Sequence, residues 1–345
     1  MAYTTIDDPS EYFTINHYTG SGSSGLQVRN SANAGTFTPD WLWIKPTSLS
    51  DNHTVFDSTR GFDKQLKIAT DDEDTHSPAR ITRETNGFDV DTTDQNYNQS
   101  SATYVAWQWI ANGGSTSTNS DGSVNVTIQV NSTAGFSIMK WNGNGNTSGT
   151  VGHGLGAKPD FIVEKYGLDG TSNWGVAFPA LETSKLLTLN STSGFATASG
   201  LSGYNTTVWT DGNGAATGGT IAYAFKNIQG YSKFGKYTGT GNSDGPFVYT
   251  GFKPAWLMIK RKEGSGYWVM LDNKRNTPNG TGKRLGAQAT DAEYGSANVD
   301  IVSNGFKVRA SNSDSDTNLN GDDYVFMAFA EHPFVSSEGV PVTAR

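Results

Sequence analysis

The string Pro254-Ala-Trp-Leu-Met-Ile-Lys260 decides how the chain is organised, because it occurs three times. Its other copies are Pro39-Asp-Trp-Leu-Trp-Ile-Lys45 and Pro159-Asp-Phe-Ile-Val-Glu-Lys165. Each copy is a short, mainly apolar run between a proline and a lysine, which is typical of a mostly buried β-strand. Three copies of one strand indicate an internal repeat.

Two further strings recur in the same order. A glycine-phenylalanine pair opens a strand in each repeat, at Gly87-Phe88, Gly194-Phe195 and Gly305-Phe306. An alternating, aromatic-rich strand then closes each repeat, at 104–109, 221–225 and 324–329. Short strands between glycine-rich turns, with no helical pattern, predict an all-β chain of three tandem β-sandwiches of the jelly-roll or concanavalin-like type.

These strings give the chain definite expected boundaries. We expect an N-terminal arm over 1–11, sandwich repeats over 12–112, 136–228 and 231–334, a linker with an extra strand over 113–135, and a C-terminal tail over 335–345. The alternating run from Val124 to Val130 is expected to pair with a neighbouring domain or another subunit. The arm is either a frayed terminus, which is the default, or an attachment strand.

The amino-acid composition excludes several classes of partner and site. Lys+Arg 25 against Asp+Glu 33 gives a net charge of -8, so no broad basic surface is expected for nucleic acid. Cys 0 excludes disulfides and thiolate metal sites. The first residues lack a signal-peptide pattern, and no apolar run approaches the roughly 20 residues of a membrane span. We therefore expect a protein made in a cytosol, with no membrane insertion.

No residues stand out as catalytic. The five histidines occur singly, without zinc-site spacing, at His17, His53, His76, His153 and His332. No serine lies in a Gly-x-Ser-x-Gly motif, and no acidic pair recurs between the repeats. The sequence predicts no enzyme, with a polysaccharide depolymerase as a remote alternative.

One acidic loop has oxygen ligands at every second position, as hard cations prefer. They are Asp314, Asp316, Asn318 and Asn320. However, Leu319 and Val325 stand where an EF-hand loop needs glycine and glutamate. A calcium ion is the alternative there and a solvated loop is the default; a second acidic loop spans Asp71 to Asp74. No other cofactor is expected.

Two groups of side chains are assigned on position alone. Tryptophans within the recurring strands are expected in the core, whereas those near turns are candidates for exposed ligand contacts: Trp141, Trp174, Trp209 and Trp268. An Asp-x-x-Arg string follows a strand in two repeats, at Asp57 and Arg60 and at Asp272 and Arg275, and predicts a structural ion pair rather than a ligand contact. The middle repeat lacks these charges.

Three stretches of the third repeat are specific enough to compare with a known family, namely Tyr231–Lys260, Ser303–Val308 and Tyr324–Phe334. They resemble an uncharacterised family of virion structural proteins of tailed phages, common in marine and cyanobacterial viruses. The stretches Ala134–Ile138, Gly152–Gly156 and Pro159–Phe161 are similar to the same family, and the first repeat matches its strand pattern.

The resemblance implies a non-enzymatic virion component, assembled in the bacterial host cytoplasm with other virion proteins and released by lysis. We expect a tail fibre or adhesin module, most simply a homotrimer, that contacts a glycan or protein of the host surface. The alternative is a capsid decoration protein that clamps the head. The sequence leaves this choice open.

Overall fold

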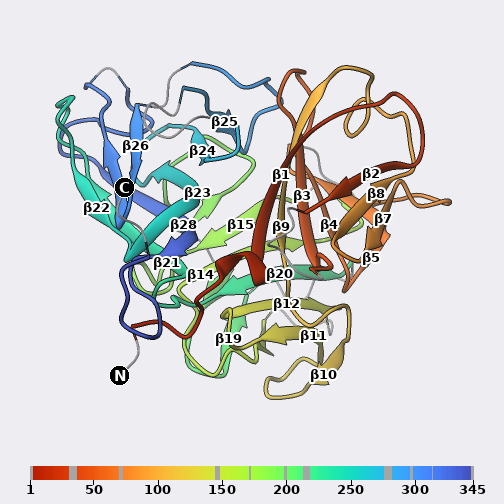
Figure 1. Cartoon of the computed structure of the whole chain (residues 1–345). Coiled ribbons are helices and arrows are strands. Elements are labelled where there is room, and N and C mark those ends of the chain that lie inside the picture. Colours follow the sequence, from red (N-terminus) through yellow and green to blue (C-terminus); the bar gives the residue numbers. More distant parts are fainter. Residues whose placement is uncertain are drawn as a thin grey trace.

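The structure is a computed structural model. It describes residues 3–30, 37–69, 73–143, 148–170, 172–197, 200–212, 218–275, 282–295, 298–312 and 314–342. Its described part is all-β, with six sheets, one short 3-10 turn η1 (Pro9–Glu11) and no α-helix. The sheets form three pairs, each a large sheet facing a small one, and we name these pairs units 1, 2 and 3 in chain order. Figure 1 shows the three units around a common centre.

Unit 1 contains strands β1 to β9. Its large sheet has the order β1 (Phe13–Thr19), β9 (Thr103–Trp109), β3 (Trp41–Pro46), β4 (Thr54–Asp57), β5 (Gly61–Lys67) and β6 (Glu73–Thr75). Its small sheet has the order β2 (Leu26–Arg29), β8 (Gly87–Val90) and β7 (Ile81–Glu84).

Unit 2 contains strands β10 to β20. Its large sheet has the order β10 (Ser117–Asn119), β11 (Val126–Asn131), β12 (Phe136–Trp141), β20 (Thr220–Phe225), β14 (Phe161–Tyr166), β15 (Trp174–Ala177), β16 (Lys185–Thr188) and β17 (Ala196–Thr197). Its small sheet has the order β13 (Gly149–Gly152), β19 (Val208–Asp211) and β18 (Leu201–Ser202).

Unit 3 contains strands β21 to β28. Its large sheet has the order β21 (Ser232–Thr238), β28 (Asp323–Pro333), β23 (Phe252–Arg261), β24 (Trp268–Asp272) and β25 (Leu285–Gly286). Its small sheet has the order β22 (Phe247–Tyr249), β27 (Gly305–Val308) and β26 (Val299–Val302). Apart from the extra hairpin β10–β11 in unit 2, the first five strands of each large sheet have the same order of neighbours, and units 1 and 2 add a sixth strand, β6 and β17.

The recurring strands are apolar on both faces because each large sheet lies between two cores. In β3, Leu42 and Ile44 point into a core private to unit 1, between its two sheets. Trp41 and Trp43 point the other way, into a core shared by all three units. A strand buried on both faces loses the hydrophobic alternation of a half-exposed strand. This explains why the quoted strings read as continuous apolar runs.

Aromatic rings dominate the shared core. The ring centroid of Trp41 lies 4.4 Å from that of Trp109 in its own unit and 4.5 Å from that of Tyr223 in unit 2. Trp109 in turn lies 5.9 Å from Trp256 and 5.5 Å from Phe329, both in unit 3. The three units are therefore packed on one another through their large sheets.

The lysine that ends each recurring string is fully buried. Lys45 and Lys260 fasten neighbouring units, whereas Lys165 donates to the Gly170 carbonyl of its own unit at 3.1 Å. Lys45 Nζ donates to the Thr290 carbonyl of unit 3, 3.3 Å away. Lys260 Nζ donates to the Thr192 carbonyl of unit 2, 3.1 Å away. Burial lowers the pKa of Lys45 and of Lys260 to about 8. These lysines thus act as donors to loop carbonyls and not as surface charges.

Each of the two Asp-x-x-Arg ion pairs lies at a contact between two units. Asp57 and Arg60 form a fully buried ion pair, with 2.5 Å between Oδ2 and Nε, and the Tyr223 hydroxyl of unit 2 donates to the same Oδ2 at 2.8 Å. Asp272 and Arg275 repeat the pair at 2.7 Å, and Trp107 Nε1 of unit 1 donates to Asp272 at 3.3 Å.

Where the ion pair is missing, its donor is missing too. By strand register, Phe178 of unit 2 takes the place of the aspartates, and Met327 of unit 3 takes the place of Tyr223 and Trp107. At the third contact, between units 2 and 3, the residues at both matching positions are thus apolar. The absence of the charges in unit 2 is therefore matched by the absence of a donor in unit 3.

Two segments outside the sandwiches are also ordered. The frayed-terminus expectation for the arm is wrong over 3–11, because Thr4, Ile6 and Pro9 are buried and Thr4 donates to the Gln229 carbonyl at 2.7 Å. In the linker, β11 pairs with β12 of the unit that follows it. The extra strand is thus an edge strand of unit 2.

Candidate functional site

The four tryptophans predicted as exposed contacts are buried, so that prediction is corrected. Trp141, Trp174, Trp209 and Trp268 are each at most 2% exposed. Trp268 Nε1 donates to the Thr188 carbonyl across the contact between units 3 and 2, at 2.9 Å. Proximity to a turn did not place these rings outside, because the strands are buried on both faces.

Side chains of the predicted calcium loop form ion pairs and hydrogen bonds with other protein groups. Asp314 pairs with Arg284 at 3.1 Å, and Asp316 accepts from the Tyr267 N–H at 2.9 Å. Asn318 is buried, with its side-chain N–H group donating to the Asn242 carbonyl at 2.8 Å. Asn320 is exposed. The described contacts of these residues are thus with protein groups, as in the default reading of a structural loop, and a calcium ion there stays a prediction.

Unit 1 contains a loop of the same construction. Asn98 is buried like Asn318, its side-chain N–H group donates to the Ser23 carbonyl at 2.7 Å, and its oxygen accepts from the Ser21 N–H. Tyr104 donates to the Gln95 carbonyl there, as Tyr324 does to Ser315 in unit 3. A loop that recurs with the same hydrogen bonds is a structural element. The residues Asp71 and Asp72 of the other acidic loop lie outside the described residues.

A buried carboxyl in unit 2 is the strongest candidate for acid–base chemistry. Glu164 is 1% exposed and Asp211 is fully buried beside it. Burial, and then the nearby Asp211, raise the pKa of Glu164 well above its ordinary value. Asp211 accepts from Trp141 Nε1 at 3.3 Å. Because both carboxyls are enclosed within the private core, no substrate can reach them, and we assign them to the structure of unit 2.

Glu164 has Ile44 and Ile259 at the matching positions of units 1 and 3. We expect Glu164→Ile to raise the free energy of unfolding at pH 7 by about 1–3 kcal/mol. The unfolded chain ionises Glu164 near pKa 4.5, whereas burial and the nearby Asp211 raise its pKa well above that value in the folded chain. The wild type therefore loses stability as pH rises above about 4.5. Denaturant unfolding at pH 4 and pH 7 checks this: the gain should be smaller at pH 4, and equal gains would contradict it.

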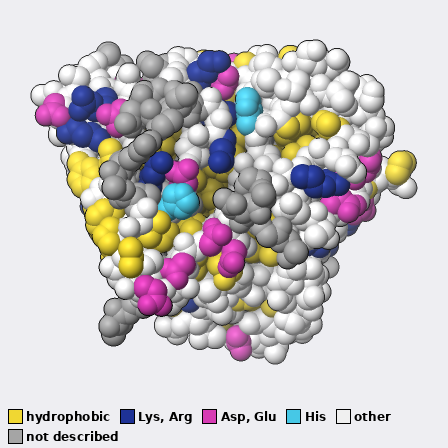
Figure 2. Space-filling model, viewed as in Figure 1, with side chains coloured by type: hydrophobic (Ala, Val, Ile, Leu, Met, Phe, Trp, Pro, Cys, Tyr) yellow, Lys and Arg dark blue, Asp and Glu magenta, His cyan; other side chains and the backbone are white. Residues whose placement is uncertain are grey.

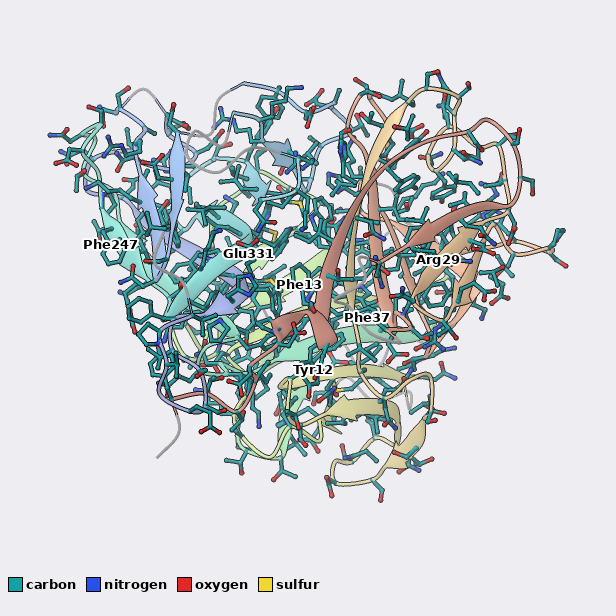
Figure 3. The ribbon with its side chains drawn as sticks, in the orientation of Figure 1. Tyr12, Phe13, Arg29, Phe37, Phe247 and Glu331 are labelled. Atoms are coloured by element: carbon teal, nitrogen blue, oxygen red, sulfur yellow. The ribbon has the colours of Figure 1, made fainter. Side chains whose placement is uncertain are left out.

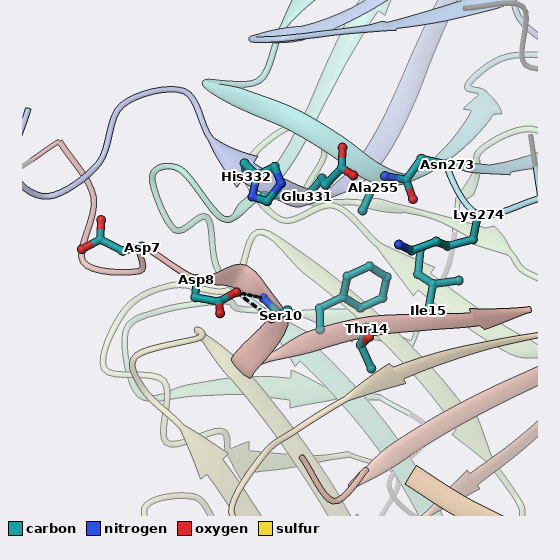
Figure 4. Close-up of a pocket in the computed structure, with 12 residues that line it drawn as sticks. Asp7, Asp8, Ser10, Thr14, Ile15, Ala255, Asn273, Lys274, Glu331 and His332 are labelled. Atoms are coloured by element: carbon teal, nitrogen blue, oxygen red, sulfur yellow. Dashed lines mark hydrogen bonds between the residues drawn. The ribbon is translucent and has the colours of Figure 1, made fainter. Parts of the chain in front are cut away.

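A polar pocket lies where the arm and unit 1 meet unit 3. Its volume is about 490 Å³. Phe13, Ile15, Ala255 and Ala330 supply apolar side chains to it. Polar side chains surround the space in Figure 4, namely Asp7, Asp8, Ser10, Thr14, Asn273, Lys274, Glu331 and His332.

Several of these polar groups already have partners. Asp8 accepts from the Ser10 N–H at 2.9 Å and caps η1. Glu331 pairs with Lys253 at 2.6 Å. Hydrogen bonds from the Ser337 side chain and backbone lower the pKa of Asp7 and fasten the C-terminal tail to the arm. These contacts hold the rim of the pocket in place.

Other groups around the polar pocket are free to bind. Asn273 Oδ1 is buried and has no hydrogen-bond partner among the described residues. Lys274 and His332 are exposed. A buried carbonyl oxygen without a donor is costly, and a ligand hydroxyl or amide would satisfy it. The arrangement fits a small, hydroxyl-rich ligand with an apolar face.

An aromatic groove of about 490 Å³ lies between units 2 and 3. Phe247 and Tyr249 on β22 are 49% and 54% exposed, and Leu181 of unit 2 is 36% exposed. These three are among only five large hydrophobic side chains exposed in the described part of the chain, and all three line the groove. Hydrophobic side chains gather at this edge in Figure 2, and Figure 3 shows Phe247 at the outer edge of unit 3.

Comparison with known families gives one result. A model of the DUF7483 family, described as a domain of unknown function, matches residues 8–333. The chain belongs to the DUF7483 family. Neither the curated proteins nor the solved structures gave a match.

Two features are absent from the described part of this DUF7483 chain. Over the described ranges, no group of three or more His, Asp or Glu side chains could hold a metal ion. No helix within the same ranges has the length and apolarity to cross a membrane.

Neither the polar pocket nor the aromatic groove was predicted from the sequence. Only the groove had a signal, since Phe247-Val-Tyr249 places two aromatics on one face of a short strand.

Proposed function

We propose that the chain is a non-enzymatic structural protein exposed on the surface of a tailed-phage particle, where it attaches to a host-surface glycan. The observation that carries the ligand assignment is the polar pocket, with its apolar floor and the buried, unpartnered Asn273 Oδ1. Saccharides present an apolar ring face and many hydroxyls, which is the chemistry such a pocket complements. The virion setting rests on the sequence resemblance.

The proposal includes a triplicated origin for the fold. Each unit is a β-sandwich derived from one ancestral copy, and the three copies follow one another in the chain. The recurring strand order and the matching loops at Asn98 and Asn318 support this reading. One chain then brings together three sandwiches, and a trimer of chains would multiply weak contacts further.

Binding through the polar pocket predicts a specific mutational result. Asn273→Ala and His332→Ala should each weaken binding of the purified full chain to its glycan by about tenfold, the effect of one lost hydrogen bond of about 1.4 kcal/mol. His17→Ala is the matched control, since His17 is also exposed and lies on β1 outside the pocket. A glycan array of bacterial surface polysaccharides supplies the ligand.

The same labelled protein separates the two virion roles. It is incubated with host cells and, in parallel, with capsids that lack it. Retention on cells that is lost in Asn273→Ala supports the adhesin. Retention on capsids alone overturns the adhesin and favours a decoration protein that stabilises the head.

A further inference from the structure

The open side of unit 3 is closed in unit 2 by a segment of this same chain. There β11 pairs antiparallel with β12, with Ile128 opposite Met139. Just before β11, Val124 bridges to Val151 of the small sheet, and its N–H donates to the Thr150 carbonyl at 3.1 Å. Val126 and Ile128 are buried in the private core of unit 2. The hairpin therefore seals both sheets of unit 2 along one side.

The equivalent side of unit 3 has no such strand among the described residues. By register, β21 corresponds to β12, with Gly235 at the place of Met139 and Lys236 at the place of Lys140. Among the described strands, β21 pairs with β28 alone and β22 with β27 alone, although Ser232 of β21 also bridges to Ile228. Five consecutive residues of β21, from Lys233 to Tyr237, line the aromatic groove instead.

The edge of β21 that faces away from β28 is covered by the preceding residues at Ser232 and Phe234 and is open from Lys236 onward. The Ser232 and Phe234 N–H groups point away from β28, because they donate to the Ile228 carbonyl and to Asn227 Oδ1. Alternation along an antiparallel strand then directs the Lys236 N–H outward as well. No hydrogen bond from the Lys236 N–H occurs within the described part of the chain. An open strand edge of this kind is a template for another strand.

Side chains around the edge specify what would bind. Gly235 has no side chain, and the Phe326 ring lies against it, where a Cβ would meet a ring carbon at 2.8 Å. An apolar residue opposite Gly235 would pack on this ring, as Ile128 packs in unit 2. Lys236 is exposed and lies on the other face from Gly235, so an acidic residue opposite it would complement the edge.

We propose that β21 of unit 3 accepts an extended strand from a partner protein, with alternating apolar and acidic residues, in the manner of β11 on β12. Backbone hydrogen bonds would supply affinity, and Phe247 and Tyr249 would cover the apolar side chains. This site is separate from the polar pocket and does not depend on the proposed glycan.

The test uses the full chain and the labelled peptide Val-Glu-Val-Glu-Ile-Glu-Val-Asn, which follows residues 124–131 with glutamate at its alternate positions. Fluorescence anisotropy should detect binding below about 1 mM. Lys236→Pro removes only an outward N–H and is tolerated at a sheet edge, so it should weaken binding by about tenfold or more. Lys236→Ala keeps the N–H and should weaken binding only about two- to fivefold.

A peptide of the same composition with the order Val-Val-Ile-Val-Glu-Glu-Glu-Asn is the control, and thermal unfolding verifies that both variants fold. His332→Ala should leave peptide binding unchanged. The proposal is overturned if no binding of the alternating peptide occurs by about 1 mM, if the control peptide binds equally well, or if Lys236→Pro binds as the wild type does. If Lys236→Pro binds the peptide as the wild type does but Phe247→Ala does not, the peptide binds to a patch of side chains and not to a strand edge.

Discussion

Asp57→Ala is expected to lower the free energy of unfolding by about 3–5 kcal/mol, because it leaves Arg60 and the Tyr223 hydroxyl buried without their shared acceptor. Burial alone would lower the pKa of Arg60, but Asp57, Tyr223 and Glu73 outweigh it and raise that pKa. A guanidinium keeps its proton at neutral pH in proteins, and Glu73 remains 3.2 Å from Arg60, so the arginine stays charged when Asp57 is removed. Urea unfolding followed by tryptophan fluorescence measures the loss.

Unit 2 supplies the matched variant for this site. Its apolar residue Phe178 stands where Asp57 stands in unit 1. The triple variant Asp57→Phe, Arg60→Leu, Tyr223→Phe removes the charges and the donor together and should lose less stability than Asp57→Ala. Asp244→Ala, at an exposed ion pair, should leave stability unchanged. A loss below about 1 kcal/mol for Asp57→Ala would contradict the assigned role of the pair.

Trp41→Ala is expected to cost about 3–5 kcal/mol, since it opens a cavity at the centre of the shared core. The ring contacts Trp109 of unit 1 and Tyr223 of unit 2, so the loss should spread beyond unit 1. Hydrogen exchange should show weaker protection in β9, β20 and β28 alike.

Phe247→Ala is the control for Trp41→Ala, because it removes an aromatic ring that is 49% exposed. Its stability should stay within about 0.5 kcal/mol of the wild type. Faster exchange confined to unit 1 in Trp41→Ala would show that the units do not share the core.

The sequence predicted which segments are strands more accurately than it predicted which side chains are exposed. The string from Pro39 to Lys45 predicted a buried strand, and the structure buries it on both faces. Because the strands are buried on both faces, the prediction that Trp141 and Trp209 are exposed was wrong. A period of two shows that side chains alternate between two faces, but it does not show whether the second face meets solvent or another core. The spacing of Asp57 and Arg60 suggested an ion pair but could not reveal its donor, Tyr223, which lies 166 residues away.

The candidate sites depend on contacts that no local pattern encodes. The polar pocket joins Asp8 of the arm to Asn273 and Glu331 of unit 3, which are far apart in the chain. The aromatic groove forms because Leu181 of unit 2 lies beside β21 and β22 of unit 3. Both sites are products of the packing of the units, so they require the shared core to be intact.

Differential scanning calorimetry of the unmodified chain tests most directly whether the three units are one body around one core. Our account predicts a single transition whose calorimetric enthalpy is about equal to its van't Hoff enthalpy. Several transitions, or a calorimetric enthalpy about three times the van't Hoff value, would show that the units unfold independently and would contradict the account.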